Sequence, residues 1–153
     1  MTARMPNPAI VAGPDVIPAL LSVAGAVKNT GVPETTINLI YLRVSQINGS
    51  SWNVHKHASD LKEAGESAER ISTVAAWRET PFFTPEERAA LALAEAATRL
   101  SDRQDAVSDE VWAEAAKYFS DQQLAGILLA TGLSNLWHRL IPTTRQPAGP
   151  VGG

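Results

Sequence analysis

The sequence predicts an all-α protein, and two observations carry that prediction. Apolar residues recur at intervals of three and four positions along most of the chain, and no segment alternates apolar and polar residues for long. Helix start and stop residues separate these periodic segments. We therefore expect seven helices and no strand.

The first three helices are expected over residues 18–28, 33–47 and 51–64. Pro18 fits the first turn of a helix, where a missing N–H is tolerated. Asn48 and Gly49 end the second helix, and Ser50 is a good N-cap for the third. The chain should therefore turn sharply at residues 48–50.

Four more helices are expected to begin after the cap residues Ser67, Thr84, Ser108 and Ser120. The first of them runs to about Arg78. The second covers residues 85–100 and opens with a proline and two acids, which suit the positive end of a helix. The last is apolar on more than one side, which is typical of a central helix or of a helix shared between subunits; we favour the second and expect an oligomer.

The length of 153 residues is most naturally that of one domain. Such a domain buries roughly 70% of the surface that its unfolded chain exposes. We expect it over residues 15–146. A flexible N-terminal arm at residues 1–14, which holds three prolines, and a flexible C-terminal tail at residues 147–153 should flank it.

Composition argues against several classes of function. The net charge is −3 and the basic residues are scattered, so we expect no nucleic-acid partner. Apolar stretches fall far short of the roughly 20 residues of a membrane span, and we expect no leader, no membrane partner and a cytoplasmic location. The chain has no cysteine, so disulfides and thiolate metal sites are excluded. We expect neither metal nor cofactor.

Polar functional groups concentrate in residues 50–57, SSWNVHKH. On a helix Asn53 and His57 face each other, whereas Ser50 lies about 10 Å from His57 along the axis, so a direct Ser–His dyad is not expected. His55 and His57 point about 200° apart and cannot bind one metal together. We expect His55 at the surface, and His57 is either a structural or a functional histidine.

Three segments carry a resemblance to a known family: LRVSQING at 42–49, AAWRETPFFTPEERAAL at 75–91 and TRQPAG at 144–149. They resemble the alkylhydroperoxidase D-like branch of the carboxymuconolactone decarboxylase family. The resemblance implies a compact multi-helix fold, a homo-oligomer that is a trimer or hexamer, and peroxide reduction. In that chemistry one thiolate attacks peroxide, a second thiol resolves a disulfide, and a Glu and a His relay protons.

The functional positions of that family fall on Ser50 and Asn53 for the two cysteines, Asn38 for the glutamate and His57 for the histidine. Only the histidine is retained. Serine and asparagine cannot form a sulfenic acid or a disulfide, and no other thiol exists in the chain. We therefore predict that the protein has no intrinsic dithiol peroxidase activity.

Three interpretations of the altered site remain open. In the first, Asn38, Ser50, Asn53 and His57 form a neutral, mutually hydrogen-bonded cluster without activity. In the second, they bind a small polar or carboxylate ligand, and His57 is the acid or base of a cofactor-free lyase or isomerase. In the third, the protein is a non-catalytic oligomeric binding protein.

Overall fold

A computed structural model describes residues 2–149 and is helical without strands over that range. The elements are α1 Pro8–Val11, α2 Val16–Lys28, α3 Glu34–Ile47, α4 Ser51–Glu63, α5 Ala68–Thr73, the 3₁₀ helix η1 Val74–Glu79, α6 Pro85–Thr98, α7 Asp109–Tyr118 and α8 Asp121–Leu140. The predicted all-α class is confirmed.

Most of the predicted start residues cap their helices. Ser67 and Ser108 accept a backbone N–H, and Thr84 and Ser120 form complete capping boxes with the residues three positions on. Ser50 is the exception. It stands at the N-cap position of α4, but its hydroxyl accepts no backbone N–H and instead donates to the side chain of Asn53.

The helices differ from the predicted seven in two places. A short helix, α1, lies before residue 15, where no helix was expected, and its Ala9 is buried. The single helix expected up to Arg78 is broken, because α5 ends at Thr73 and Ala76 has non-helical backbone angles (φ −117°, ψ 30°). After α5 the chain continues as the 3₁₀ helix η1, and the Arg88 guanidinium donates to the carbonyls of Trp77, Arg78 and Thr80.

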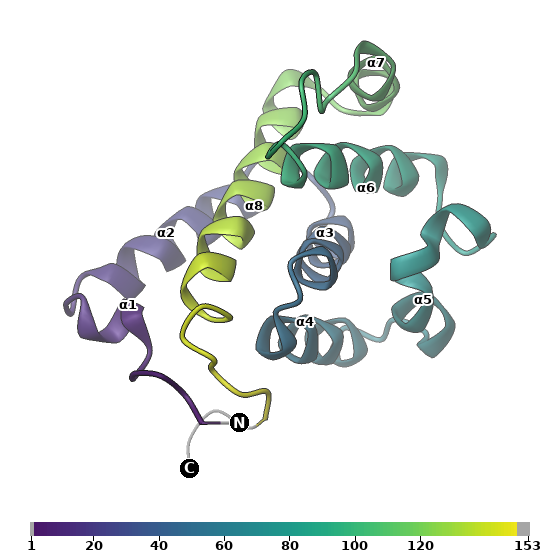
Figure 1. Cartoon of the computed structure of the whole chain (residues 1–153). Coiled ribbons are helices and arrows are strands. Elements are labelled where there is room, and N and C mark those ends of the chain that lie inside the picture. The colour runs from purple at the N-terminus through teal and green to yellow at the C-terminus, as the bar shows by residue number, and fades with distance from the viewer. Residues whose placement is uncertain (1, 150–153) are drawn as a thin grey trace.

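Helix α3 lies at the centre of the molecule, with α8 on one side and α4 and α6 on others (Figure 1). Two clusters of buried apolar side chains surround it. One is built around Ile40, Val44 and Ile127 between α3, α6 and α8, and the other around Leu42, Leu61 and Leu91 between α3, α4 and α6. Any polar side chain of α3 that points inward therefore faces another helix.

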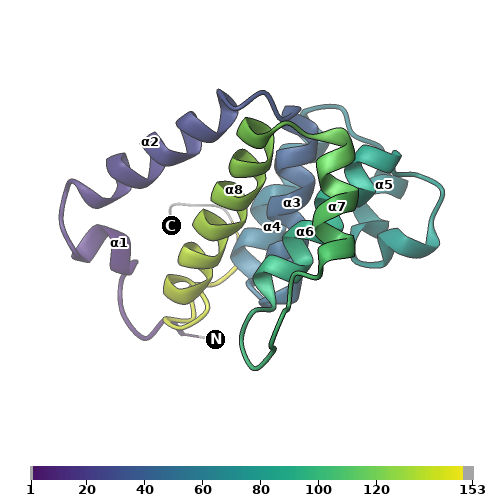
Figure 2. The same cartoon turned by 90° about the horizontal axis from the view of Figure 1, so that it is seen from above.

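Helix α2 is packed mainly against α8 and α1 and diverges from the rest of the molecule (Figure 2). Just beyond the C-terminal end of α2, Thr30 lies against Gly126 of α8. Two hydrogen bonds connect the N-terminal segment with the segment that follows α8. The Arg4 N–H donates to the Thr144 carbonyl at 2.9 Å, and the Gln146 side-chain amide donates to the Met5 carbonyl at 2.9 Å.

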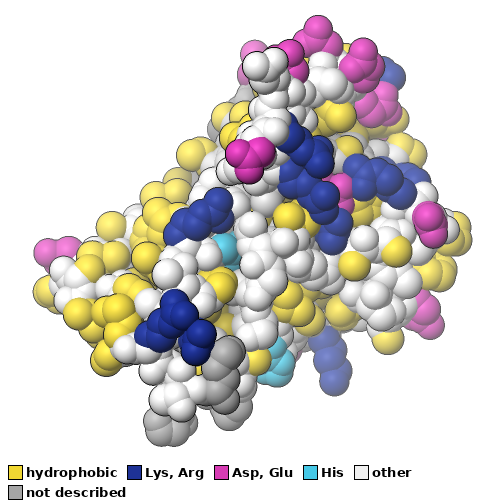
Figure 3. Space-filling view, viewed as in Figure 1, with side chains coloured by type: hydrophobic (Ala, Val, Ile, Leu, Met, Phe, Trp, Pro, Cys, Tyr) yellow, Lys and Arg dark blue, Asp and Glu magenta, His cyan; other side chains and the backbone are white. Residues whose placement is uncertain are grey.

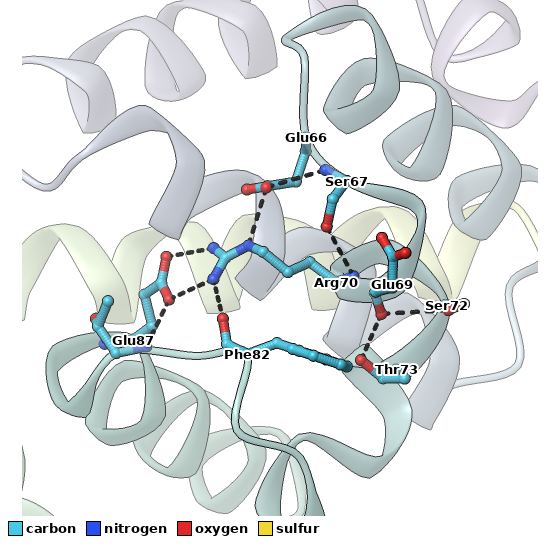
Figure 4. Close-up of polar contacts among 9 residues, drawn as sticks. Glu66, Ser67, Glu69, Arg70, Ser72, Thr73, Phe82 and Glu87 are labelled. Atoms are coloured by element: carbon cyan, nitrogen blue, oxygen red, sulfur yellow. Dashed lines mark hydrogen bonds and ion pairs between the residues drawn. The ribbon is translucent and has the colours of Figure 1, made fainter.

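The corner between α5 and α6 is organised by Arg70 (Figure 4). Its guanidinium donates two hydrogen bonds to Glu87, at 2.6 and 3.0 Å, and its Nε lies 2.9 Å from Glu66. It also donates to the Phe82 carbonyl and lies 5.0 Å from the centre of the Phe83 ring. One arginine thus holds both sides of this connection.

Candidate functional site

Helix α3 and its C-cap residue, Asn48, carry a polar stripe on one face: Asn38, Tyr41, Ser45 and Asn48. Their spacing of three, four and three residues places them one above the other along the helix. Tyr41 faces α4, where its ring is stacked on His57 with the ring centres 5.1 Å apart. Ser45 faces α8, where it meets His138. The stripe therefore lies between the predicted site and α8.

Ser50 and Asn53, at the start of α4, form a closed pair. The Ser50 hydroxyl donates to Asn53 Oδ1 at 2.6 Å, and both residues are buried. Because Ser50 uses its proton on Asn53, it has no base beside it that could activate it as a nucleophile. The sharp turn at Gly49, which has φ of +65°, brings Ser50 into this position.

His57 lies one turn further along α4 and is largely buried, with 17% of its side chain exposed. Its Nδ1 is 3.6 Å from the Asp60 carboxylate, beyond hydrogen-bond distance, and has no hydrogen-bond partner among residues 2–149. Burial lowers the pKa of His57 to about 4; the Asp60 charge opposes this shift and the Lys56 charge adds to it. His57 is therefore neutral at pH 7.

The four predicted site residues are brought together only in part. Ser50 is paired with Asn53, but no hydrogen bond joins this pair to Asn38 or His57 within the described part of the chain. Asn38 is half-buried on the α3 stripe, one turn before Tyr41. Instead of the predicted neutral cluster of four, the structure has the bonded Ser50–Asn53 pair and, one turn further along α4, a histidine that is stacked on Tyr41 and whose Nδ1 has no hydrogen-bond partner among the described residues.

His138 on α8 is a second buried histidine, which the sequence pattern did not predict. Its Nε2 is 3.1 Å from Ser45 Oγ and its Nδ1 is 2.9 Å from Asn48 Nδ2. Burial, followed by the charges of His57 and Arg139, lowers its pKa to about 4. The spacing of the polar residues on α3 can be read from the sequence, but the sequence does not indicate that α8 packs against them.

Other kinds of site find no support in the described residues. No group of three or more histidine and carboxylate side chains is arranged to hold a metal ion within residues 2–149. None of the helices in that range is both long and apolar enough to cross a membrane. The other strongly connected carboxylate, Glu95 of α6, is bound by Arg43, Arg78 and Trp77 and is buried.

Residues 14–96 match the sequence model of the carboxymuconolactone decarboxylase family. The chain is 32% identical over 127 residues to the uncharacterized protein YdfG of Bacillus subtilis, which covers 83% of this chain and 85% of YdfG.

Solved structures with the same fold point the same way. A protein of unknown function from Agrobacterium tumefaciens, described as a candidate antioxidant defence protein AhpD, aligns with a TM-score of 0.87 and 29% identity over 99% of this chain and 100% of that one. The alkylhydroperoxidase AhpD core of an uncharacterized peroxidase-related protein from Ralstonia eutropha aligns with a TM-score of 0.76 over 89% of this chain and 72% of that one. At 19% identity, this second likeness shows the fold alone.

Proposed function

The chain belongs to the carboxymuconolactone decarboxylase family, in its alkylhydroperoxidase D-like branch, and we propose that it has lost the dithiol peroxidase activity of that branch. One observation carries the proposal: the buried Ser50–Asn53 pair stands where the two cysteines are expected. Reduction of a peroxide by a dithiol consumes two thiols and yields an alcohol, water and a disulfide. A hydroxyl and an amide cannot supply those electrons.

The test is hydroperoxide turnover with tert-butyl hydroperoxide as oxidant and dithiothreitol as reductant. We expect the unchanged protein to consume no peroxide above the protein-free rate. The matched positive control is the double variant Ser50→Cys with Asn53→Cys, alone and combined with Asn38→Glu, and turnover should appear in it. Turnover by the unchanged protein at the rate of the double variant would contradict the proposal.

A second activity, cofactor-free acid–base chemistry at His57, has its own support. The histidine is neutral at pH 7 and its Nδ1 is buried without a partner, so it has an unused hydrogen-bonding atom. In this proposal His57 transfers a proton of a small polar or carboxylate substrate. The amide of Asn38 or of Asn53 supplies a hydrogen bond to the enolate that develops.

A panel of lactones and keto acids tests this activity by product formation, with His57→Gln as the inactivating variant. His55→Gln is the matched control, because His55 lies two residues away on the exposed side of α4. Loss of turnover in the first variant alone supports the proposal. Conversion of a substrate by His57→Gln at the rate of the unchanged protein would show that His57 is not the acid or base.

We also propose that the protein is a homo-oligomer that uses the face formed by α2 and α8. Only Val27 of the 13 residues of α2 is buried, and Leu21 is 62% exposed. A groove of about 570 Å³ between α2 and α8 is lined only by apolar residues, among them Leu20, Val23, Leu129 and Leu136. Hydrophobic side chains are spread over this side of the molecule (Figure 3). Contiguous exposed apolar side chains of this kind are typical of surfaces that bind another protein chain.

Light scattering coupled to size exclusion tests the oligomer, which the family resemblance suggests is a trimer or hexamer. We expect Leu129→Glu to lower the mass to that of one chain. Leu100→Glu is the control, since Leu100 is 57% exposed, comparable to 49% for Leu129, but does not line the groove. A monomeric unchanged protein would contradict the proposal. The cytoplasmic location stays a prediction from the sequence.

A further inference from the structure

A continuous set of side-chain hydrogen bonds joins α3, α6 and α8, outside the Ser50–Asn53 pair. Asn48 Nδ2 lies 2.9 Å from both Asn135 Oδ1 and His138 Nδ1. Asn135 Nδ2 lies 2.9 Å from the Thr131 carbonyl and 3.3 Å from Thr98 Oγ1. His138 Nε2 lies 3.1 Å from Ser45 Oγ.

The direction of each hydrogen bond in this set follows from its two ends. Asn135 must direct its NH₂ at the Thr131 carbonyl, which can only accept, so its Oδ1 is left to accept from Asn48. Asn48 therefore presents N–H groups to both Asn135 and His138. The consequence is that Nδ1 of His138 must be an acceptor.

The other end of the set leads to the same protonation state. The Ser45 hydroxyl donates its proton to the Tyr41 carbonyl at 2.7 Å. Towards His138 the Ser45 oxygen can therefore only accept, so the ring proton is on Nε2. A neutral His138 protonated at Nε2 satisfies every member. A doubly protonated ring would direct an N–H at the N–H of Asn48.

We propose that Ser45, Asn48, Asn135 and His138 form a latch that holds the C-terminal half of α8 against α3 at neutral pH and opens when His138 is protonated in acid. A flip of the Asn48 amide would let its oxygen accept from a protonated His138 Nδ1. The same oxygen would then face Asn135 Oδ1, so the hydrogen bond to Asn135 would be lost. Turning Asn135 as well would direct its oxygen at the Thr131 carbonyl. Protonation at one atom thus disrupts the latch as a unit.

The surroundings of His138 do not favour its charged form. The charged groups that act on it are His57 of α4 and Arg139 of α8, both cationic when protonated. The latch partners from α3 and α6 are neutral: Ser45, Asn48 and Thr98. His138 itself is buried. The lowered pKa of His138, about 4, agrees with this geometry.

Opening the latch would reach beyond the two helices. The end of α8 leads to Thr144, whose carbonyl accepts from the Arg4 N–H, and to Gln146, whose amide donates to Met5. The same half of α8 carries Leu136 of the apolar groove. Acid release of the latch therefore frees the junction of the two chain ends and the adjoining part of the α8 surface.

Hydrogen exchange of the full chain at pH 7 and pH 4, corrected for intrinsic exchange rates, tests the latch. In the unchanged protein we expect protection over residues 131–144 to fall at least tenfold at pH 4. In His138→Asn, which keeps an acceptor for Asn48 but cannot be protonated, the fall should be less than threefold. His57→Gln is the control for the other buried histidine and should keep most of the fall.

A second variant and an NMR measurement test the latch independently of how well His138→Asn folds. His138→Gln keeps a donor for Ser45 and also cannot be protonated, so it should behave as His138→Asn does. Nitrogen chemical shifts of the His138 ring in the unchanged protein should show the proton on Nε2 at pH 7. A ring protonated at Nδ1, or an acid-induced fall of tenfold that persists in both variants, would overturn the proposal.

Discussion

The indole Nε1 of Trp77 donates a 3.0 Å hydrogen bond to Oε1 of Glu95, and Arg43 and Arg78 bind the same carboxylate. Burial alone would raise the pKa of the Glu95 carboxyl. The hydrogen bonds from Arg78, Arg43 and Trp77 outweigh burial and hold the pKa below its usual value. Glu95 is therefore a charged group in the core that connects α3, η1 and α6.

Replacing this carboxylate should destabilise the fold. Glu95→Gln leaves the Arg43 guanidinium, 11% exposed, without its counter-charge. We expect the free energy of unfolding to fall by about 3 kcal/mol, the usual cost of breaking a buried pair from one side. Urea denaturation measures it. The control Glu86→Gln, on the exposed first turn of α6, should cost under about 1 kcal/mol; equal losses in both variants would contradict the prediction.

The pKa of His57 should respond in opposite directions to its two charged neighbours. The Asp60 charge raises that pKa and the Lys56 charge lowers it. Asp60→Asn should therefore move the pKa of His57 below about 4, and Lys56→Gln should move it above that value. Proton NMR titration of the His57 ring measures both shifts. Shifts of the same sign would show that the two charges do not act on His57 as the geometry indicates.

Burial of His57 also predicts a sign for the pH dependence of stability. Its pKa is lowered from 6.5 to about 4 in the folded chain, so between these values the unfolded chain takes up a proton that the folded chain does not. The contribution of neutral His57 to the free energy of unfolding is fully present above pH 6.5. It is lost as the pH drops towards 4, and the loss amounts to up to about 3 kcal/mol.

Unfolding free energies measured at pH 7 and pH 4 check this dependence. The difference between the two should shrink by about 2 to 3 kcal/mol in His57→Gln, because glutamine takes up no proton. His55→Gln, on the exposed side of the same helix, should leave the difference as it is. An unchanged difference in His57→Gln would mean that His57 is not held neutral by the fold.

The junction of α2 and α8 depends on the absence of a side chain at Gly126. A Cβ built there would lie 2.1 Å from Thr30 Oγ1 and 2.8 Å from Thr30 Cβ. Gly126→Ala should cost about 1 to 3 kcal/mol, despite the better helix propensity of alanine. Gly25→Ala, where the space is open, should be neutral or stabilising.

A double variant identifies the cause of that cost. Thr30→Gly removes all three atoms that a Cβ at Gly126 would meet, so the combined variant should recover part of the loss, relative to the sum of the two single variants, in thermal or urea unfolding. Strict additivity of the two substitutions would show that the clash is not the reason for the cost.

The helical class and most helix starts could be predicted, because caps and apolar periodicity are local properties of the sequence. Thr84 and Ser120 illustrate this, since each forms its bonds within its own first turn. The break at Ala76 could not be predicted in the same way. It depends on Arg88, more than ten residues further on, whose guanidinium binds the carbonyls of Trp77 and Arg78.

In the candidate site, too, contacts within one helix could be predicted and contacts between helices could not. Ser50 and Asn53 lie within one turn of each other, and their pairing depends on little else. His57 required knowledge of Tyr41, on another helix, and His138 required that α8 be placed against Ser45, 93 residues earlier. Contacts between helices decide which polar residues are buried together, and periodicity within one helix does not encode the partner.

Of the residues at the corner between α5 and α6, Arg70 should contribute most to the free energy of unfolding. It pairs with Glu87 through two hydrogen bonds, and Glu87 also closes the capping box of α6 through the Thr84 N–H. Arg70→Ala leaves that carboxylate, on a residue only 9% exposed, without its guanidinium. We expect a loss of about 2 to 4 kcal/mol in the free energy of unfolding, measured in urea.

Arg70→Lys separates charge from geometry at this corner. A lysine keeps the positive charge but has no guanidinium to form the two hydrogen bonds to Glu87 and to lie over the Phe83 ring. It should therefore recover less than half of the loss seen in Arg70→Ala. Arg103→Ala, at an exposed arginine between α6 and α7, is the control and should change stability by less than about 0.5 kcal/mol. Full recovery by lysine would show that charge alone holds the corner.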